Sequence, residues 1–289
     1  MPLYKKTEYL RNKILIILFI LFSMLLLSSF KSLFGYNTVR TPIEDDLATN
    51  RSMCLKSADC EIFNLGKSRE GHLISGYILN SQNINRNNVR RLDIISGMHG
   101  DEQTALYFTN NLFKLLLERS KTESNYVYYI LPMSNPDAII KNRRLITEDL
   151  NRVFANNTID SPEEASIIRL LELDTDKYNE RILLSIHAGY EGVLYPPGDI
   201  AFIDNTKRIT YEAIGNEFCE ALSISKNKCP MQSYFDYQTV GELADYYDKK
   251  YGKALTLEIS EQKKLEEEGA ANIVSKYESL FKLIKSKYQ

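Results

Sequence analysis

Residues 92–102 read LDIISGMHGDE and join an apolar segment to His99 and Glu102. The run at 92–96 predicts a buried strand, and the apolar spacing over 101–118 predicts a helix. His99 and Glu102 therefore lie between a strand end and a helix mouth, three positions apart. Residues at i and i+3 share a helix face, so the two side chains can point at a common centre.

Similar strand and helix patterns alternate through the rest of the chain. Apolar runs predict strands at 126–133, 181–186 and 254–259, and residues 262–288 predict a charged amphipathic helix. Pro162 marks a helix start, with Ser161 and Glu164 as a possible capping box. This alternation predicts a single α/β domain over 61–289, built on a mixed, mainly parallel twisted sheet flanked by helices.

The N-terminal segment has a membrane-like composition. Residues 14–30 (ILIILFILFSMLLLSSF) carry no charge and would span roughly 26 Å as a helix. Basic residues precede the run, which predicts a cytoplasmic N-terminus at 1–13, a transmembrane signal anchor at 14–34 and a linker at 35–60. The alternatives are a cleaved signal peptide and a buried core helix. The anchor would place the catalytic domain on the periplasmic side of the inner (cytoplasmic) membrane.

Composition and cysteine positions narrow the function. The 289 residues carry a formal net charge of −2, which argues against a nucleic-acid partner. Four cysteines follow the apolar run: Cys54, Cys60, Cys219 and Cys229. Outside the cytosol an even number of cysteines predicts disulfides. Three pairings are possible, and the simplest consists of two local disulfides, Cys54–Cys60 and Cys219–Cys229. Four buried thiols are the alternative.

Further polar residues fall at or near predicted strand ends. His187 ends the strand at 181–186, and together with His99 and Glu102 it would complete a three-ligand zinc site with one open position. A purely structural histidine is the alternative. Arg144 and the stretch 149–152 (DLNR) suit an anionic group, or else a loop held by salt bridges. Glu258 is an acid inside an apolar strand, where burial could tune it as a general base.

Several short motifs occur in a fixed order over residues 65–260. They are GKSREG at 66–71, His99 with Glu102, Asn135-Pro136-Asp137, DLNR at 149–152, the Pro162-Glu163 helix start, His187, YQTVG at 237–241 and Glu258. Each is weak alone, but the ordered set resembles the M14 zinc carboxypeptidase family. The set is closest to the murein peptide amidase and cell-wall carboxypeptidase branch. It is also similar to the succinylglutamate desuccinylase and aspartoacylase branch.

The resemblance implies a role for each site residue. His99, Glu102 and His187 would bind one zinc ion per chain. Arg144 would polarise the scissile carbonyl, and Asn151 and Arg152 would hold the substrate's free carboxylate. Tyr237 would close over the substrate, and Glu258 would activate the metal-bound water.

The expected function is hydrolysis of a peptide or amide bond next to a residue with a free carboxylate, in peptidoglycan peptides, by a monomer. The alternatives are an N-acyl amino acid deacylase and a non-catalytic peptide-binding module. The resemblance places the pocket for the released residue at the stretch around Glu242, Ala244 and Asp245, and its acidic groups would attract an amine on the released side chain of a muropeptide. A helix beginning after Gly241, capped by these acids, is the competing interpretation.

Overall fold

A seven-stranded sheet forms the centre of the part of the chain that the structure describes. This computed structural model describes residues 42–259, apart from 87–88, 121–124, 157, 179, 191–192, 199–202 and 222–236. The strands are β1 (Cys60–Lys67), β2 (Leu73–Leu79), β3 (Arg90–Ser96), β4 (Tyr126–Leu131), β5 (Glu180–Ala188), β6 (Val193–Tyr195) and β7 (Lys253–Ile259). Their order in the sheet is β1-β2-β4-β3-β5-β7-β6.

The four central strands are parallel, and the edge strands are antiparallel. β3 pairs in parallel with both β4 and β5, and β5 pairs in parallel with β7. At one edge β2 pairs with β4 and β1 pairs with β2, and at the other edge β6 pairs with β7; all three pairings are antiparallel. The mixed sheet expected from the sequence is confirmed. The chain leaves β3 first for β4 on one side and later for β5 on the other, and open α/β sheets bind ligands at such a switch point.

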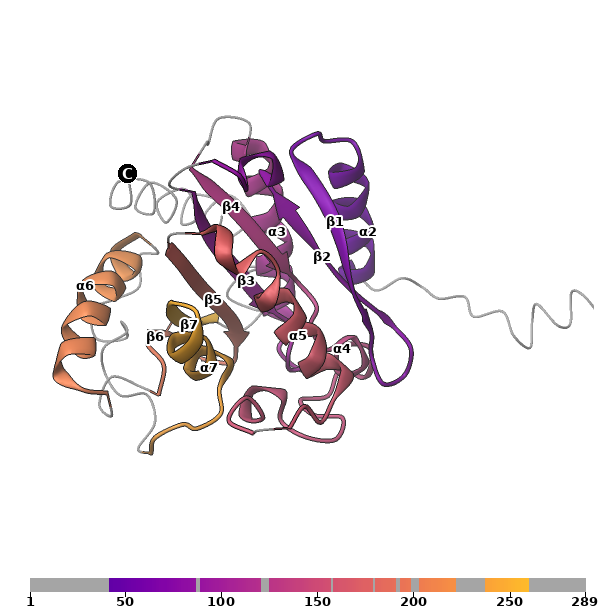
Figure 1. Cartoon of the computed structure of the whole chain (residues 1–289). Helices are drawn as coiled ribbons and strands as arrows, with labels where there is room; N and C mark the ends of the chain where they lie inside the picture. The colour runs from indigo at the N-terminus through magenta and orange to yellow at the C-terminus, as the bar shows by residue number, and fades with distance from the viewer. Residues whose placement is uncertain are drawn as a thin grey trace, which may run out of the picture. The chain divides into compact units, whose positions relative to one another are not determined.

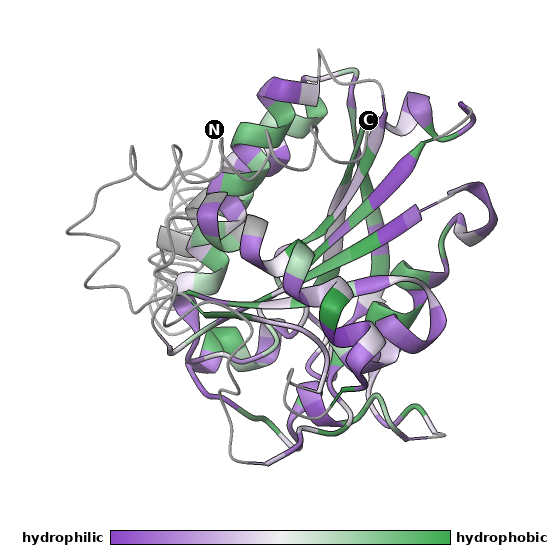
Figure 2. Cartoon of the chain, turned by 90° about the vertical axis from the view of Figure 1, so that its left-hand side faces the viewer, coloured by the Kyte–Doolittle hydropathy of each residue, from purple (hydrophilic) through white to green (hydrophobic). Residues whose placement is uncertain are grey.

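Helices cover both faces of this sheet (Figure 1). They are α2 (Pro42–Leu55), α3 (Gln103–Ser120), α4 (Pro136–Lys141), α5 (Pro162–Glu172), α6 (Asn205–Ala221) and α7 (Leu243–Lys250), with short 3-10 turns at Ser81–Asn83, Leu150–Arg152 and Thr175–Lys177. Side chains of α2, α3 and α6 pack in one apolar core, and those of α5 and α7 pack in the other. In Figure 2 the strands between the two helical layers are largely hydrophobic. Strands buried on both faces need such continuous apolar runs.

The folded domain begins earlier than the sequence suggested. Part of the expected linker at 35–60 forms α2, and Asn50 of α2 donates hydrogen bonds to the backbone oxygen and side chain of Asn110 in α3. A disulfide joins Cys54 to Cys60 and so ties α2 to β1. Cys219 is also disulfide-bonded, while Cys229 lies outside the described residues.

The expected signal anchor and the expected C-terminal helix at 262–288 lie outside the described residues. Within residues 42–259, as far as they are described, no helix is long and apolar enough to span a bilayer.

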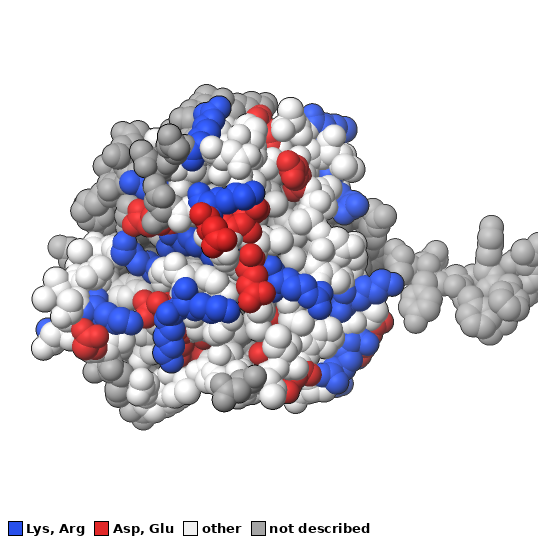
Figure 3. Space-filling model, viewed as in Figure 1, with Lys and Arg blue, Asp and Glu red and all other residues white. Residues whose placement is uncertain are grey.

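A buried ionic network lies between the sheet and the α5–α7 layer. Asp93 Oδ1 accepts from Arg91 Nε at 2.8 Å, and Asp93 Oδ2 accepts from Tyr247 at 2.7 Å and from Arg181 at 3.2 Å. Both guanidinium groups thus share one carboxylate that is fully buried. Basic and acidic side chains lie next to each other on the surface in this view (Figure 3). Lys250 of α7 and Glu172 of α5 form one exposed ion pair.

Candidate active site

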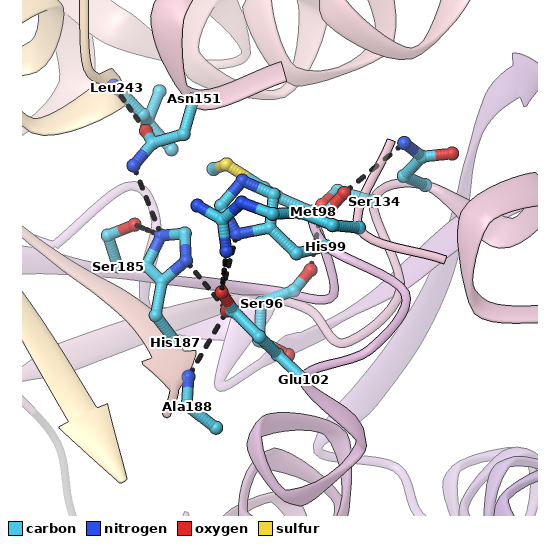
Figure 4. A network of polar contacts seen from close by, with 12 residues as sticks. Ser96, Met98, His99, Glu102, Ser134, Asn151, Ser185, His187, Ala188 and Leu243 are labelled. Carbon is cyan, nitrogen blue, oxygen red and sulfur yellow. Dashed lines mark hydrogen bonds and ion pairs between the residues drawn. The ribbon is translucent and has the colours of Figure 1, made fainter. Parts of the chain in front are cut away.

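His99, Glu102 and His187 meet at the switch point of the sheet. Each offers a ligand atom within 4.8 Å of the other two, and all three side chains are buried. Both imidazole rings turn toward the carboxylate in Figure 4: Nδ1 of His99 lies 2.7 Å from Glu102 Oε1, and Nδ1 of His187 lies 3.0 Å from Oε2. Two imidazole nitrogens and one carboxylate are a donor set that catalytic zinc sites use, so the residues present fit this metal.

A second set of polar groups fixes the orientation of the two histidines. His99 Nε2 lies 2.8 Å from Asp149 Oδ1, and His187 Nε2 lies 3.2 Å from Ser185 Oγ. The Asp149 carboxylate can only accept, so it holds the proton of His99 on Nε2 and leaves the Nδ1 lone pair directed at the common centre. Asp149 also accepts from the backbone amide of Asn151 at 2.9 Å, which ties it to its own loop.

The charges of the cluster are strongly coupled. Burial alone would lower the pKa of His99, but the hydrogen bonds to Asp149 and Glu102 outweigh it and raise the pKa to about 9. Burial would raise the pKa of Glu102, yet attraction to His187 and His99 holds it well below the usual range for a carboxyl. The site therefore stabilises positive charge between these side chains, as a cation-binding centre requires.

Glu258 lies beside this cluster on the neighbouring strand. Its Cα is in register with that of His187 across the β5–β7 ladder, and its side chain is buried. Oε2 accepts no hydrogen bond from the described residues. Burial raises the pKa of Glu258 to about 7, with His187 lowering it and Glu102 raising it. A carboxylate with a pKa near neutrality suits a general base.

Arginine side chains from the 142–152 segment reach the same region. Arg144 Nη1 donates to Glu102 Oε1 at 2.9 Å, and its Nη2 lies 3.6 Å from Asp149 Oδ2. Arg152 Nη1 donates to the backbone oxygen of Asn151 at 2.7 Å and lies 3.3 Å from Glu242 Oε1. These contacts aim two guanidinium groups at the cavity from one side.

Asn151 and Tyr237 also face the cavity, but in different ways. Asn151 is buried, and its side-chain oxygen accepts from the backbone amide of Leu243 at 2.9 Å, which leaves its amide nitrogen 3.5 Å from His187 Nε2 (Figure 4). Tyr237 is 55% exposed, so its ring lies at the rim.

Two glycines permit the close approach of the site loops. A side chain at Gly100 would meet the backbone oxygen of Ala138 at 1.8 Å, and Asn135 Nδ2 donates to the Met98 oxygen at 3.2 Å in the same contact. Gly241 adopts a φ of +79°, and a Cβ there would lie 2.3 Å from the Arg152 oxygen. The glycines thus let the 135–143 and 149–152 segments press against the loops that carry His99 and Glu242.

These residues surround a single cavity of about 870 Å³. All eight site residues expected from the sequence line it: His99, Glu102, Arg144, Asn151, Arg152, His187, Tyr237 and Glu258. Glu242 and Tyr195 line it as well. A volume of this size suits a ligand with more than a few heavy atoms.

Sequence reasoning gave no role to three residues of the site. Asp149 was visible as the first residue of the DLNR motif, and Ser185 precedes His187 by two positions. Tyr195 lies in the short strand β6, which the sequence pattern did not reveal. Of the two acids expected near the pocket, Glu242 lines the cavity whereas Asp245 does not.

The fold is of the metallocarboxypeptidase type. The fold is similar to that of a metallo-carboxypeptidase from Burkholderia cenocepacia, with a TM-score of 0.67 and 16% identity over 84% of this chain and 69% of that one. It is also similar to carboxypeptidase A from Helicoverpa armigera, with a TM-score of 0.71 and 17% identity over 86% and 73% of the two chains. These likenesses confirm the fold expected from the M14 resemblance.

The family follows from the sequence match. Residues 88–284 match the succinylglutamate desuccinylase/aspartoacylase catalytic domain, and the chain belongs to this family. A probable aspartoacylase from Acaryochloris marina (strain MBIC 11017) is 29% identical over 113 residues, which cover 36% of this chain. The match spans only 37% of that relative.

Proposed function

We propose that the protein is a zinc-dependent hydrolase that cleaves an amide bond next to a residue with a free carboxylate. The observation that carries this proposal is the convergence of His99, Glu102 and His187 within 4.8 Å, beside a buried carboxylate in the same cavity. Two histidines and one acid leave a coordination position for water or substrate, which distinguishes catalytic from structural zinc sites.

Five further side chains of the cavity would have roles in this reaction. When bound, zinc would supply Lewis acidity toward the scissile carbonyl and a more acidic water molecule. Glu258 would accept the proton of the attacking water and pass it to the leaving nitrogen. Arg144, with its guanidinium against Glu102, would donate to the oxygen that gains negative charge. Arg152 and the Asn151 amide would hold the substrate carboxylate, and Tyr237 would cover the substrate from the rim.

Membership of the succinylglutamate desuccinylase/aspartoacylase family favours an N-acylated amino acid as substrate. The size of the cavity, about 870 Å³, favours a second candidate, a short peptide such as a wall peptide with a free carboxyl end. Both substrates present an amide bond next to a residue with a carboxylate, so the same residues serve either one.

An extracytoplasmic location belongs to the proposal as well. The Cys54–Cys60 disulfide and the apolar run at 14–30 both support it, because disulfides persist in oxidising compartments. A reporter fused after residue 60 should be active outside the cytoplasm; activity confined to the cytoplasm would contradict this part of the proposal.

The reaction is tested with the full chain, purified in detergent and loaded with zinc. It is incubated with N-acetyl and N-succinyl amino acids and with murein tripeptide and tetrapeptide, and released amino acids are identified by mass spectrometry. The Glu258→Gln variant, which should keep its zinc, is the matched control. Release of an amino acid by the parent but not by the variant supports the proposal. Zinc and peptide binding without any hydrolysis would favour the non-catalytic binding module instead.

A further inference from the structure

A second cavity, of about 750 Å³, lies at the opposite end of the parallel strands from the candidate active site. Glu180 and Lys253, the first residues of β5 and β7, line this rear cavity, whereas His187 and Glu258 lie near the other ends of the same strands. Arg181 also lines it, and about 20 Å of strand separates Arg181 from His187. The two cavities share no lining residue.

The wall of the rear cavity carries an excess of positive charge. Its three lysines each form an ion pair with one acid of the lining: Lys207 with Asp248, Lys250 with Glu172, and Lys253 with Glu180. Arg181 is the fourth cation, and its ion pair is with Asp93, which Arg91 contacts as well. One fully buried carboxylate therefore serves two buried guanidinium groups. An anion in the rear cavity would supply the second negative charge.

The buried atoms of this lining that lack partners point to the same kind of ligand. Arg181 Nη2 donates to Asp93 Oδ2 at 3.2 Å and to the Leu171 oxygen at 3.0 Å. Its Nε and Nη1, and the hydroxyl of Tyr251, are buried without a hydrogen-bond partner among the described residues. In the lining of the candidate active site, the corresponding unpaired atoms are all carboxylate oxygens. The active site thus lacks donors, whereas the rear cavity lacks an acceptor.

Tyrosine rings compensate only part of the buried charge of Arg181. Its Cζ lies 4.6 Å from the centre of the Tyr251 ring and 5.4 Å from that of Tyr247. A ring face attracts a cation, but N–H groups in the guanidinium plane still need acceptors at their edge. Tyr251 is the C-cap residue of α7, and no hydrogen bond from the described part of the chain holds its hydroxyl. Its ring can therefore turn aside and admit a ligand to the guanidinium.

We propose that the rear cavity binds a small organic phosphate, with Arg181, Tyr251 and Lys250 as its contacts. The Lys250 ammonium lies 5.1 Å from the centre of the Tyr251 ring, on the path to Arg181. A phosphate group carries a charge of about −1.5 to −2 and three acceptor oxygens, which can meet donors from several directions. A carboxylate offers only two oxygens in one plane. The volume of about 750 Å³ leaves room for the organic part of the ligand.

The test is calorimetric titration of the full-length, zinc-loaded protein in detergent with glycerol 3-phosphate and with succinate. Both are dianions, so they differ in acceptor geometry rather than in charge. Glycerol 3-phosphate should bind with a dissociation constant below about 1 mM, and succinate at least about tenfold more weakly. Tyr251→Phe, which removes only the hydroxyl, and Lys250→Gln should each weaken phosphate binding by about three- to tenfold. Arg181 is left intact because it also binds Asp93 in the core.

Two further variants locate the binding. Lys249→Gln changes a neighbouring lysine that does not line the rear cavity, and it should leave the affinity unchanged. Arg152→Gln removes a cation from the candidate active site and should also leave it unchanged.

Five results would overturn the inference. In the parent protein they are a dissociation constant above about 1 mM for glycerol 3-phosphate, or equal affinity for succinate. In the variants they are unchanged affinity after either Tyr251→Phe or Lys250→Gln, equal weakening by Lys249→Gln, which would indicate non-specific attraction to surface lysines, and loss of binding in Arg152→Gln. The last result would place the phosphate at the candidate active site. None of these measurements depends on hydrolysis, so the inference and the proposed function stand or fall separately.

Discussion

Replacing Glu258 with glutamine should remove catalysis and at the same time stabilise the protein at alkaline pH. Glutamine has the shape of the carboxyl group but cannot accept the proton of the attacking water. It also carries no charge, whereas Glu258 must ionise in a buried site where Oε2 lacks a donor among the described residues. Function and stability therefore oppose each other at this side chain, as expected for a group tuned by burial.

The size of the stability gain follows from the shift in the pKa. Burial raises the pKa of Glu258 from 4.5 to about 7, so the folded state holds the proton more tightly than the unfolded state. Below pH 4.5 the residue is neutral in both states and has no effect on stability. As the pH rises from 4.5 through about 7, Glu258 ionises more readily in the unfolded chain, so its ionisation favours the unfolded state. At about 1.4 kcal/mol per pKa unit, the variant should be about 1 kcal/mol more stable than the parent at pH 5 and about 3 kcal/mol at pH 8.

The assay is urea unfolding of both proteins at pH 5 and pH 8 after removal of metal with a chelator. Chelation matters because a bound cation would lower the pKa of Glu258 and reduce the difference. The zinc-loaded pair, measured in parallel, should show a smaller gain at pH 8. The reasoning would be refuted if the variant were no more stable than the parent at pH 8. It would also be refuted if the gain in unfolding free energy were the same at pH 5 and pH 8. Comparable turnover by the variant would refute the general-base role.

Three further predictions concern the support of the site and the core. Asp149→Ala should weaken zinc affinity by about 10–100-fold, measured by competition with a chelating dye, because His99 Nε2 loses the acceptor that orients the ring; unchanged affinity would contradict the orienting role. Gly100→Ala should lower both the midpoint of unfolding and the zinc content, since its Cβ would meet the Ala138 oxygen at 1.8 Å. Normal values for both would show that the loops relax freely. Asp93→Asn should cost about 3–5 kcal/mol in denaturant unfolding because two buried guanidinium groups lose their shared counter-charge, and a cost below about 1 kcal/mol would refute that account.

The central strands and the candidate metal ligands could be predicted from the sequence because both leave local signals. A strand buried on two faces requires an unbroken apolar run, and LDIIS, RILLSI and ALTLEI all became parallel neighbours. The polar residues that follow such runs then gather at the carboxyl edge of the sheet, which is where His99 and His187 meet. The helix start at Ser161 was also confirmed, since its hydroxyl accepts from the Glu164 amide at 3.0 Å.

The elements that could not be predicted from the sequence are those that contact residues far along the chain or make mainly polar contacts. β1 is an edge strand with mixed exposure, so it shows no continuous apolar run. α2 is largely polar, and its attachment depends on a disulfide and on hydrogen bonds from Asn50 to Asn110, 60 positions away. The contact between Arg152 and Glu242 likewise joins distant parts of the chain. Burial of a single glutamate after a glycine leaves no periodic pattern that sequence reasoning could detect.

The in-register pair of His187 and Glu258 separates the chemistry of this protein from its selectivity. Adjacent strands lie about 4.8 Å apart, so the β5–β7 ladder sets the spacing of a candidate metal ligand and the candidate base. Arg152, Tyr237 and Glu242 come instead from loops and the start of α7, outside the ladder. Exchange of the segments that carry Arg152, Tyr237 and Glu242 should therefore change substrate preference while His187 and Glu258 keep their positions. The same division of labour would let one sheet serve deacylases and peptidases alike as their loops diverge.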